Sequence, residues 1–453
     1  MHFSQLERTI LKSRSFRPIY YLGCKTAFTM DIQQAINDVD RSGGRVLDLF
    51  AGTGVVASAL AAERNVVTVD IQEYSRVLCS ALLKAVELPS TLIERSRQAI
   101  TELKVPLAWC FEPLMEFEAI SIDQALRGER SALIDLLESP PLITYLEDGL
   151  EVPDSYLGKA VEQTIARLIS SGLESSENTV VSRNFGGVYF SYTQSIVLDA
   201  CLSAADRENN QLQDTLKAAA LSTASAIVNT VGKQFAQPIQ PRNKSGVIKS
   251  GLIKTVHKDR SVDALKTYLE WLLRYTNLPL IPNQENYMVR SDYLEGLRQH
   301  GPKCSVVYAD PPYTRDHYSR FYHVLETMCL RDNPVRSKVT KNGMSVSSRG
   351  VYREDRHQSP FCIRSTAPSA FEALFHQTSL MNLPLVLSYS PHEVGDGTHP
   401  RVVSMNQILE LAKNYYKKVD VVTVEGITHN QLNKAELQLK KREQAEIILK
   451  CFV

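Results

Sequence analysis

The stretch that decides the fold runs Val46-Leu47-Asp48-Leu49-Phe50-Ala51-Gly52-Thr53-Gly54. Its first five residues are typical of a short buried strand, the next four of a tight turn, and residues 55–60 of a helix. Strand, glycine turn and helix predict the opening unit of a nucleotide-binding α/β sheet, because glycines let the backbone approach a ligand closely. Two glycines are present where the dinucleotide fingerprint has three, which leaves a nicotinamide oxidoreductase as a distant alternative.

A second apolar run, Val66 to Val69, ends in Asp70. An acid at the end of the second strand of such a sheet is placed to hydrogen-bond the hydroxyls of a ribose. A glycine turn alone is most often an ordinary strand-to-helix connection. Asp70 follows the glycine turn at the sequence separation expected for the acid of a nucleotide site, and it therefore favours such a site.

The other informative motif is Asp310-Pro311-Pro312-Tyr313, which follows the apolar run Val306 to Ala309, where a buried strand would end. These residue types suit the gripping of a planar amine. An acid or a backbone carbonyl accepts hydrogen bonds from the amino group, and the prolines fix φ near about −65°. A tyrosine stacks on the ring, which is worth roughly 1–3 kcal/mol per base. The plainer interpretation, a strand followed by a Pro-Pro turn with a packing tyrosine, is less favoured beside the glycine turn.

Together these motifs resemble those of S-adenosylmethionine-dependent DNA adenine-N6 methyltransferases of the Dam-like (alpha) class. In that class the cofactor motif comes first, Asp-Pro-Pro-Tyr comes late, and a target-recognition region lies between them. The resemblance covers residues 18–90 and 285–330. It implies a Rossmann-like class I methyltransferase sheet, S-adenosylmethionine as cofactor and double-stranded DNA as substrate. It also suggests a bacterial or phage modification enzyme, with a restriction or defence-system protein as a candidate partner.

The resemblance implies roles for single residues, each of which also has a structural alternative. Tyr21-Leu22-Gly23-Cys24-Lys25 resembles an N-terminal motif whose aromatic lies near the cofactor sulfonium and whose lysine lies near the cofactor carboxylate. The alternatives are a core tyrosine and a surface lysine. The other cofactor-binding candidates are Asp48, Phe50, Gly52 and Gly54 in the glycine turn, Asp70 and Ile71 after the second strand, and Asp292 near the adenine amine.

Asp292 precedes a predicted helix at residues 293–297, and aspartate is also a favoured N-cap, so a cap and a cofactor contact stay equally open. Asp48 has the alternative of orienting the glycine turn without touching a ligand. In the catalytic motif, the resemblance makes Asp310 and Pro311 the acceptors of the target amine and Tyr313 the stacking residue. Pro312 completes this motif.

Composition and length fit a cytoplasmic enzyme. The chain has 453 residues, of which 43% are hydrophobic and 22% charged, so it can bury a sizeable core. No apolar run reaches the roughly 18 residues of a membrane helix, and residues 1–17 hold no signal-peptide stretch. Eight cysteines without a Cys-x-x-Cys pair favour a reducing compartment.

A large insertion is expected inside the catalytic domain. Residues 1–90 and 285–453 are predicted to form that domain, with strands at 287–290, 305–309, 383–388, 419–424 and 445–453. Residues 91–284 are mainly helical in pattern, for example at 156–171 and 216–231, and the resemblance makes them the target-recognition domain. A helix is also expected from Gln72 to Leu88.

The net charge of +1 hides a strong division along the chain. Residues 91–180 hold 16 acidic and 7 basic side chains, whereas residues 233–260 and 331–364 are basic and rich in loop-forming residues. Lys244, Lys249 and Lys254 in the first basic segment are predicted to contact a phosphate backbone. The alternative is that both basic segments are solvated surface loops.

The segment after Tyr313 mixes aromatic and cationic side chains, which suits contact with an extruded base and its phosphates. Arg315, Tyr318, Arg320 and Tyr322 are the candidates. A helix with Tyr318, Tyr322 and Leu325 on its core face explains the same spacing equally well. His317 and His323 lack a third ligand at suitable spacing, so no metal site is predicted.

The predicted function is therefore transfer of a methyl group to adenine N6 in double-stranded DNA, with the target base flipped out of the helix. Adenine-N6 methylation of RNA stays open, because contacts to the 2′-hydroxyl leave no sequence mark. Cytosine-N4 methylation is disfavoured by the motif order and the large insertion. A catalytically silent nucleic-acid-binding module on the same fold is the non-enzyme alternative.

Overall fold

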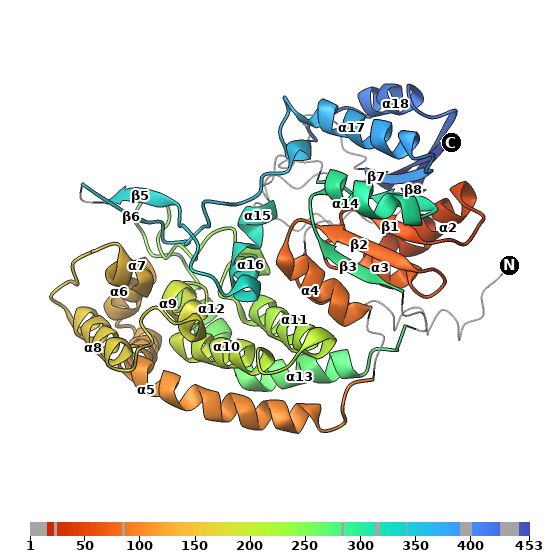
Figure 1. Ribbon diagram of the computed structural model, residues 1–453. Coiled ribbons are helices and arrows are strands. Elements are labelled where there is room, and N and C mark those ends of the chain that lie inside the picture. Colours follow the sequence, from red (N-terminus) through yellow and green to blue (C-terminus); the bar gives the residue numbers. More distant parts are fainter. Residues whose placement is uncertain are drawn as a thin grey trace. The chain divides into compact units, whose positions relative to one another are not determined.

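The computed structural model describes residues 16–21, 25–83, 87–281, 285–312, 318–341, 343–389, 401–425 and 444–453. Within these residues the chain divides into two compact units (Figure 1). The sheet unit takes the described residues of 1–87, 279–319 and 357–453, and the helical unit takes those of 88–278 and 320–356. The sequence placed 320–356 in the same domain as the sheet, so this segment differs from the expected division.

The sheet unit is built on seven strands in the order β3-β2-β1-β4-β7-β9-β8. Parallel pairing joins β1 to β2 and to β4, with Val46 opposite Val66 on one side and Val306 on the other. Strand β9 runs antiparallel to both of its neighbours. This mixed α/β architecture with a mainly parallel sheet confirms the predicted fold class. The strands are β1 (Val46–Asp48), β2 (Val66–Asp70), β3 (Tyr287–Arg290), β4 (Val306–Ala309), β7 (Leu385–Tyr389), β8 (Lys418–Glu425) and β9 (Gln444–Phe452).

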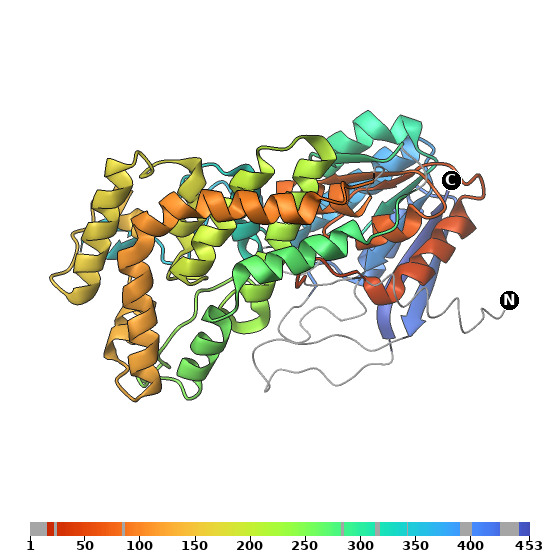
Figure 2. The same ribbon diagram turned by 90° about the horizontal axis from the view of Figure 1, so that it is seen from below.

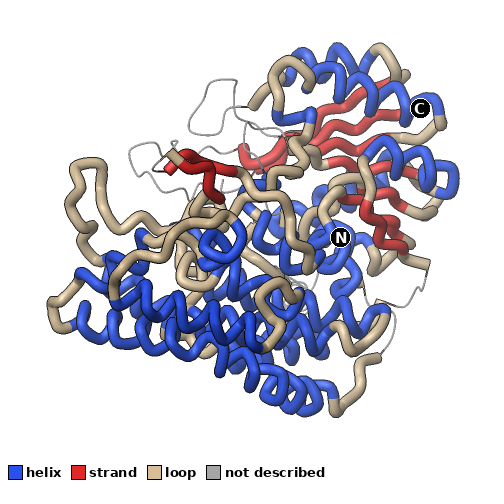
Figure 3. The backbone as a smooth tube through the Cα atoms, turned by 60° about the vertical axis from the view of Figure 1, so that its left-hand side comes forward, coloured by secondary structure: helices blue, strands red, loops and turns tan. Residues whose placement is uncertain are grey.

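Helices cover both faces of this sheet (Figure 3). Successive residues of each central strand point to opposite faces, so Val46 and Val306 pack on one side, whereas Leu47 and Val307 pack on the other. Both sides are apolar, as expected for parallel strands that are buried on both faces. The helices of the sheet unit are α2 (Thr29–Val39), α3 (Val55–Leu60), α4 (Glu73–Leu82), α14 (Tyr293–His300), α17 (Ala367–Leu380) and α18 (Met405–Lys413).

The helical unit contains one long helix, α5 (Leu92–Leu126), which changes direction along its length (Figure 2). Pro106 and Pro113 lie inside it, and a proline removes a backbone donor and crowds the preceding turn. The other helices are α6 (Ser131–Glu138), α7 (Leu142–Glu147), α8 (Tyr156–Ser170), α9 (Val180–Phe185), α10 (Tyr192–Ala205), α11 (Asn210–Ile227), α12 (Leu252–Arg260), α13 (Ala264–Thr276) and α16 (His323–Leu330). The short helix α15 (Tyr318–Phe321) spans the boundary between the units.

Two local expectations are wrong. The helix expected from Gln72 to Leu88 ends at Leu82, and the described residues just before and at Pro89 are not helical, because a proline disfavours helical geometry at the residue before it. Both basic segments were expected to be loops, but the first, 233–260, ends in helix α12, and the second, 331–364, contains the hairpin of β5 (Lys338–Lys341) and β6 (Met344–Ser347). Met344-Ser345-Val346-Ser347 does alternate apolar and polar side chains, but each strand is only four residues long and the segment is rich in charged and loop-forming residues.

Gly296 allows α14 to lie close to β2. A Cβ added at this glycine would be 2.6 Å from Cγ1 of the buried Val69 in β2. We expect Gly296→Ala to lower the melting temperature, because overpacking costs about 1–3 kcal/mol. Alanine gains only about 1 kcal/mol over glycine in a helix. Thermal unfolding measures the change, with Gln299→Ala on the exposed face of α14 as the control. A Gly296→Ala protein as stable as the wild type would contradict this packing.

Candidate functional site

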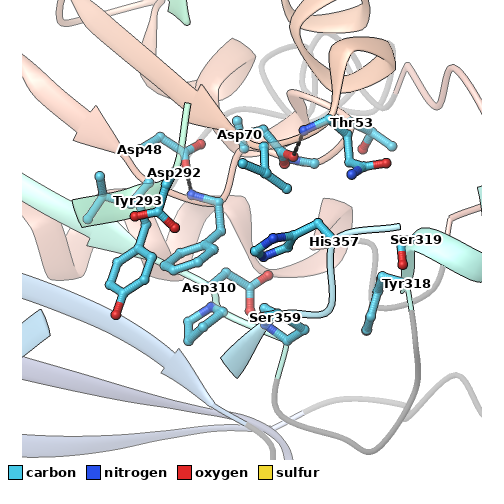
Figure 4. Close-up of a pocket in the computed structure, with 18 of the residues that line it drawn as sticks. Asp48, Thr53, Asp70, Asp292, Tyr293, Asp310, Tyr318, Ser319, His357 and Ser359 are labelled. Carbon is cyan, nitrogen blue, oxygen red and sulfur yellow. Dashed lines mark hydrogen bonds between the residues drawn. The ribbon is translucent and has the colours of Figure 1, made fainter. Parts of the chain in front are cut away.

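Three acidic side chains stand at the carboxyl ends of neighbouring parallel strands. Asp48 ends β1, Asp70 ends β2, and Asp310 follows β4. They line one cavity in the sheet unit (Figure 4). The strand order reverses at β1, and ligands of open α/β sheets bind outside the strand ends at such a point. Other lining residues are Tyr21, Lys25, Phe50, Gly52, Ile71, Asp292, Tyr293, Pro311, Pro312, Tyr318 and the segment 357–360.

Asp70 fixes the glycine turn. Its Oδ2 accepts a hydrogen bond from Gly52 N at 2.9 Å, and its Oδ1 accepts one from Gln72 N, also at 2.9 Å. Gly52 has φ of +53°, and an added Cβ would lie 3.1 Å from the Tyr21 hydroxyl. Only glycine adopts this conformation readily, so the turn stays open towards the cavity.

Gly54 has a role in helix packing. Its backbone precedes α3 with φ of +75°. A Cβ added there would lie 3.0 Å from Sγ of Cys79 on α4. The glycine therefore allows α3 and α4 to pack closely, and its assignment to the cofactor-binding residues stays a prediction.

Aromatic rings form one wall of the cavity. Phe50 stacks on Tyr293 at 5.5 Å between centroids, and Phe361 packs edge-on against both rings. Asp292 stands beside this wall and caps α14, because its Oδ1 accepts a hydrogen bond from Leu294 N at 2.9 Å. The helix cap left open by the sequence is therefore formed, and the same carboxylate also lines the cavity.

Lys25 lies between two buried carboxyl groups. Its Nζ is 3.2 Å from Asp310 Oδ1 and 3.0 Å from Glu446 Oε1. Burial raises the pKa of Asp310 and of Glu446, and the ammonium of Lys25 opposes both shifts. The structure thus places Lys25 against the acid of the Asp-Pro-Pro motif. One cation is shared by two acids that would otherwise be forced towards their neutral forms.

Asp48 is the most isolated of the acids. Its side chain is 1% exposed, and Oδ2 has no hydrogen-bond partner within the described part of the chain. Burial, followed by the nearby charges of Asp310 and Asp70, raises the pKa of Asp48 to about 8. Its Oδ1 accepts a long hydrogen bond from Phe50 N at 3.4 Å, which helps to hold the turn. Asp48 is therefore protonated at neutral pH.

The sequence missed Glu446 and the segment 357–360. Glu446 is a buried acid in β9, next to the apolar run Ile447-Ile448-Leu449. A single charge beside such a run was the available signal, since buried charges need a partner. His357 faces the cavity (Figure 4). Burial raises the pKa of the nearby Asp70, and the backbone hydrogen bonds from Gln72 and Gly52 oppose this shift. No sequence pattern marked the segment 357–360.

The predicted nucleic-acid contacts have mixed positions. Lys244, Lys249 and Lys254 are exposed on the helical unit. Tyr318 lines the cavity, with its ring centroid 6.1 Å from that of Tyr21.

Tyr322 is 1% exposed, as in the alternative of a helical core face, and this corrects its assignment as a nucleic-acid contact. Arg320 is half-buried in the helical unit. Tyr313 and Arg315 lie outside the described residues.

Comparison with known proteins gives two similarities. Residues 21–106 match the family of D12 class N6 adenine-specific DNA methyltransferases. This match confirms the resemblance drawn from the sequence, over the segment that holds Tyr21, Lys25, the glycine turn and Asp70. Modification methylase LlaI from Lactococcus lactis subsp. lactis is 24% identical over 415 residues. The aligned part is 91% of this chain and 50% of that protein, so the chain spans about half the length of this relative.

No solved structure is detectably similar to the chain. Among the described residues, no helix is long and apolar enough to cross a lipid bilayer.

Asp48→Asn is expected to change how stability depends on pH. The folded chain holds the Asp48 proton up to about pH 8, whereas the unfolded chain releases it near pH 3.8, so the wild-type protein loses stability as pH rises between these values. The variant lacks this loss. Relative to the wild type, it should gain about 2–4 kcal/mol of unfolding free energy between about pH 5 and pH 8.

Urea unfolding at several pH values measures this gain. Glu63→Gln, which changes an exposed acid of the same unit, is the control. Parallel stability curves for the wild type and Asp48→Asn would show that Asp48 ionises normally in the folded protein.

Proposed function

We propose that this protein transfers a methyl group from S-adenosylmethionine to the N6 amine of adenine in double-stranded DNA. One observation carries the proposal: a single cavity is lined both by the glycine turn with Asp70 and by Asp310, Pro311 and Pro312. The first group suits a nucleoside-containing donor, and the second suits a planar amine. A methyl transfer between two bound molecules needs both of them in one place.

The residues of the cavity fit S-adenosylmethionine. Each oxygen of Asp70 accepts one backbone hydrogen bond, which leaves lone pairs for ribose hydroxyls. Phe50 and Ile71 offer an apolar surface to an adenine ring, with the carboxylate of Asp292 beside it. The unpartnered Oδ2 of Asp48 is a polar atom that a ligand can satisfy. When bound, this cofactor supplies a methyl group carried on a positively charged sulfur.

Asp310 positions the amine of the target base in this proposal. The lone pair of an aromatic amine is delocalised into the ring, which makes the nitrogen a poor nucleophile. Hydrogen bonds from N6–H to the Asp310 carboxylate and the Pro311 carbonyl draw the nitrogen towards tetrahedral geometry, and the lone pair then becomes available. Lys25 supports this role, because its ammonium favours the ionised form of Asp310 against burial. Asp310 can also take the proton that the nitrogen sheds.

Glu446 acts as a positioning residue in the same scheme. It is 3% exposed and contacts Lys25 from β9, whereas Asp310 follows β4. When both acids are ionised, each raises the pKa of the other across the shared ammonium. Glu446 therefore influences the pH at which Asp310 becomes able to accept the amine.

The depth of Asp310 in the cavity determines how an adenine could reach it. Asp310 lies at a strand end inside the sheet unit with its side chain only 20% exposed. An adenine stacked in a duplex cannot present its amine there, so the base must be flipped out at a cost of about a few kcal/mol. The exposed lysines of the helical unit, Lys244, Lys249 and Lys254, are proposed to contact phosphates, and this unit to recognise the target sequence.

DNA is proposed over RNA because the matched family is described as adenine-specific DNA methyltransferases and the relative as a modification methylase. By the same reasoning we propose a place in a restriction or defence system, with a protein of that system as partner. Incubation with duplex DNA or RNA, followed by digestion, identifies the modified nucleoside. N6-methyladenine in DNA alone is the expected product, and a product in RNA alone would replace DNA by RNA as the substrate.

Asp310→Asn tests the catalytic assignment. The amide keeps the shape of the side chain but loses the charge that accepts the amine hydrogens. We expect S-adenosylmethionine to bind within a few-fold of the wild-type affinity by calorimetry, and methyl transfer to fall by about 100-fold or more. Glu63→Gln, an exposed acid of the same unit, should keep full activity. Undiminished transfer by Asp310→Asn would remove Asp310 from the reaction.

Glu446→Gln tests the positioning role. Without the second acid, Lys25 neutralises Asp310 alone, so Asp310 ionises at lower pH. The acidic limb of the profile of kcat against pH should shift to lower pH, with little change in KM for DNA. A purely structural role for Glu446 predicts lower activity with the limb unmoved, and that result would contradict the proposed sharing of Lys25.

A further inference from the structure

Four cations of the predicted basic segment 331–364 are neutralised within the helical unit. Arg331 pairs with Asp206, Arg336 with Glu147, Lys338 with Asp148, and Arg353 with both Asp332 and Asp355. The three arginines among them are also buried. These four side chains therefore differ from the expectation of a basic loop that contacts phosphates.

Three other arginines differ from these four side chains. Among the described residues, Arg320, Arg349 and Arg356 have no carboxylate within ion-pair distance, and we call them the guanidinium cluster because each lies near Tyr352. Each has one buried nitrogen without a hydrogen-bond partner in the described chain: Nε of Arg320, Nη2 of Arg349 and Nη1 of Arg356. Arg349 otherwise donates only to backbone carbonyls, of Ser139 at 3.2 Å and Ile239 at 3.0 Å. A buried donor without an acceptor is costly, so such a group calls for an explanation.

Tyr352 holds two members of the cluster together. The guanidinium carbon of Arg320 is 4.7 Å from the centroid of its ring, and that of Arg356 is 5.5 Å away. The ring is fixed at both ends, since its hydroxyl donates to Ala236 O at 2.7 Å and its backbone carbonyl accepts from Ser337 N at 2.8 Å. Two like charges are therefore held around one rigid ring.

The electrostatic neighbourhood of the cluster is positive. Burial, followed by the charge of Arg320, lowers the pKa of Arg356, while Asp355 and Glu354 oppose the shift. Asp355 is already bound by Arg353. Burial and the charges of Arg356, Arg353 and Arg320 lower the pKa of His323 to about 3, so this histidine, whose ring packs on Tyr352, is neutral. The folded chain thus leaves repulsion between cations in place.

The backbone next to Tyr352 is strained. Val351 is buried with φ of +50°, a conformation that is a genuine outlier for a β-branched residue. Gly350 leaves room for the ring, because a Cβ there would lie 2.4 Å from Cζ of Tyr352. Strain of this kind persists where the surrounding structure enforces it, and it concentrates at ligand-binding positions.

We propose that the guanidinium cluster and Tyr352 form a binding site for a phosphate group of the nucleic-acid backbone. A phosphate supplies acceptor oxygens for the unpartnered donors and a negative charge for cations that now repel one another. Arginine is suited to this ligand because its planar fork of donors matches phosphate geometry. The choice of nucleic acid over a free phosphate ion rests on the proposed function.

The test measures duplex DNA binding by fluorescence anisotropy over about 50 to 200 mM salt. Arg320→Gln and Arg356→Gln should each weaken binding several-fold at the higher salt. Each should also reduce the slope of log K against log salt by about 0.9, the value for one lost phosphate contact on B-DNA. Lys338→Gln removes the same charge from a paired and half-exposed residue of the same segment, and its slope should stay at the wild-type value.

Melting curves establish that each variant is folded, and they also separate two sources of the ligand. Folded variants of Arg320 and Arg356 with unchanged affinity and slope would overturn the proposal. Stabilisation by inorganic phosphate at matched ionic strength that Arg356→Gln loses, together with an unchanged DNA slope, would overturn the nucleic-acid assignment in favour of a small anion. Weaker DNA binding by both variants supports the site even if the wild-type protein methylates no adenine. The binding test can therefore succeed or fail independently of the proposed methyl transfer.

Discussion

The parallel register of three neighbouring strands is the constraint on which the site depends. Because β2, β1 and β4 start level at Val66, Val46 and Val306, their carboxyl ends meet at one edge of the sheet. Three acids that are far apart in the chain are thereby brought into one cavity. A slip of one residue in either pairing would turn an acid to the other face of the sheet. The buried apolar side chains on both faces prevent such a slip, so the geometry of the site is fixed by the core beneath it.

Acids that are buried close together destabilise one another when they are ionised. Lys25 offsets this repulsion for two of them. Asp48 stays protonated, whereas Asp310 and Glu446 share the ammonium of Lys25. Burial raises the pKa of Asp48, Asp310 and Glu446, and the ammonium of Lys25 opposes this shift for the last two. Carboxyl groups with perturbed pKa values are common where proteins bind charged ligands or move protons. In the proposed reaction the negative charge of these groups faces a positively charged donor and an amine that must lose a proton.

The sequence predicted those parts of the structure whose signal is local. A strand-to-helix turn with left-handed backbone favours glycine, so the strand, turn and helix of residues 46–60 could be predicted. The position of β3 and the approximate bounds of the later strands could be predicted as well. Asp70 and Asp310 followed from their positions at the ends of apolar runs. The close packing of Gly54 against Cys79 on α4 was not predicted, because a sequence does not show which helices will pack against a turn. Glu446 was missed because its partnership with Lys25 joins residues that are distant in the chain.

The pairing of charged side chains is a second feature that could not be predicted from the sequence. Counting cations along 331–364 suggested a basic loop, yet Arg331, Arg336 and Lys338 pair with acids from other parts of the helical unit, and Arg353 pairs with acids of its own segment. The informative residues are Arg320, Arg349 and Arg356, which have no carboxylate partner in the described chain, and composition cannot distinguish them. The number of cations in a segment can be counted from the sequence. Which of them form ion pairs within the protein is known only from the structure.

The central claim is that one cavity receives a methyl donor and a flipped adenine together. A crystal structure with duplex DNA and an unreactive analogue of S-adenosylmethionine tests it most directly. The account predicts the analogue between Gly52 and Asp292 with its ribose on Asp70, and an extruded adenine with N6 at hydrogen-bond distance from Asp310 and the Pro311 carbonyl. An analogue bound elsewhere, or an adenine amine directed away from Asp310, would contradict it.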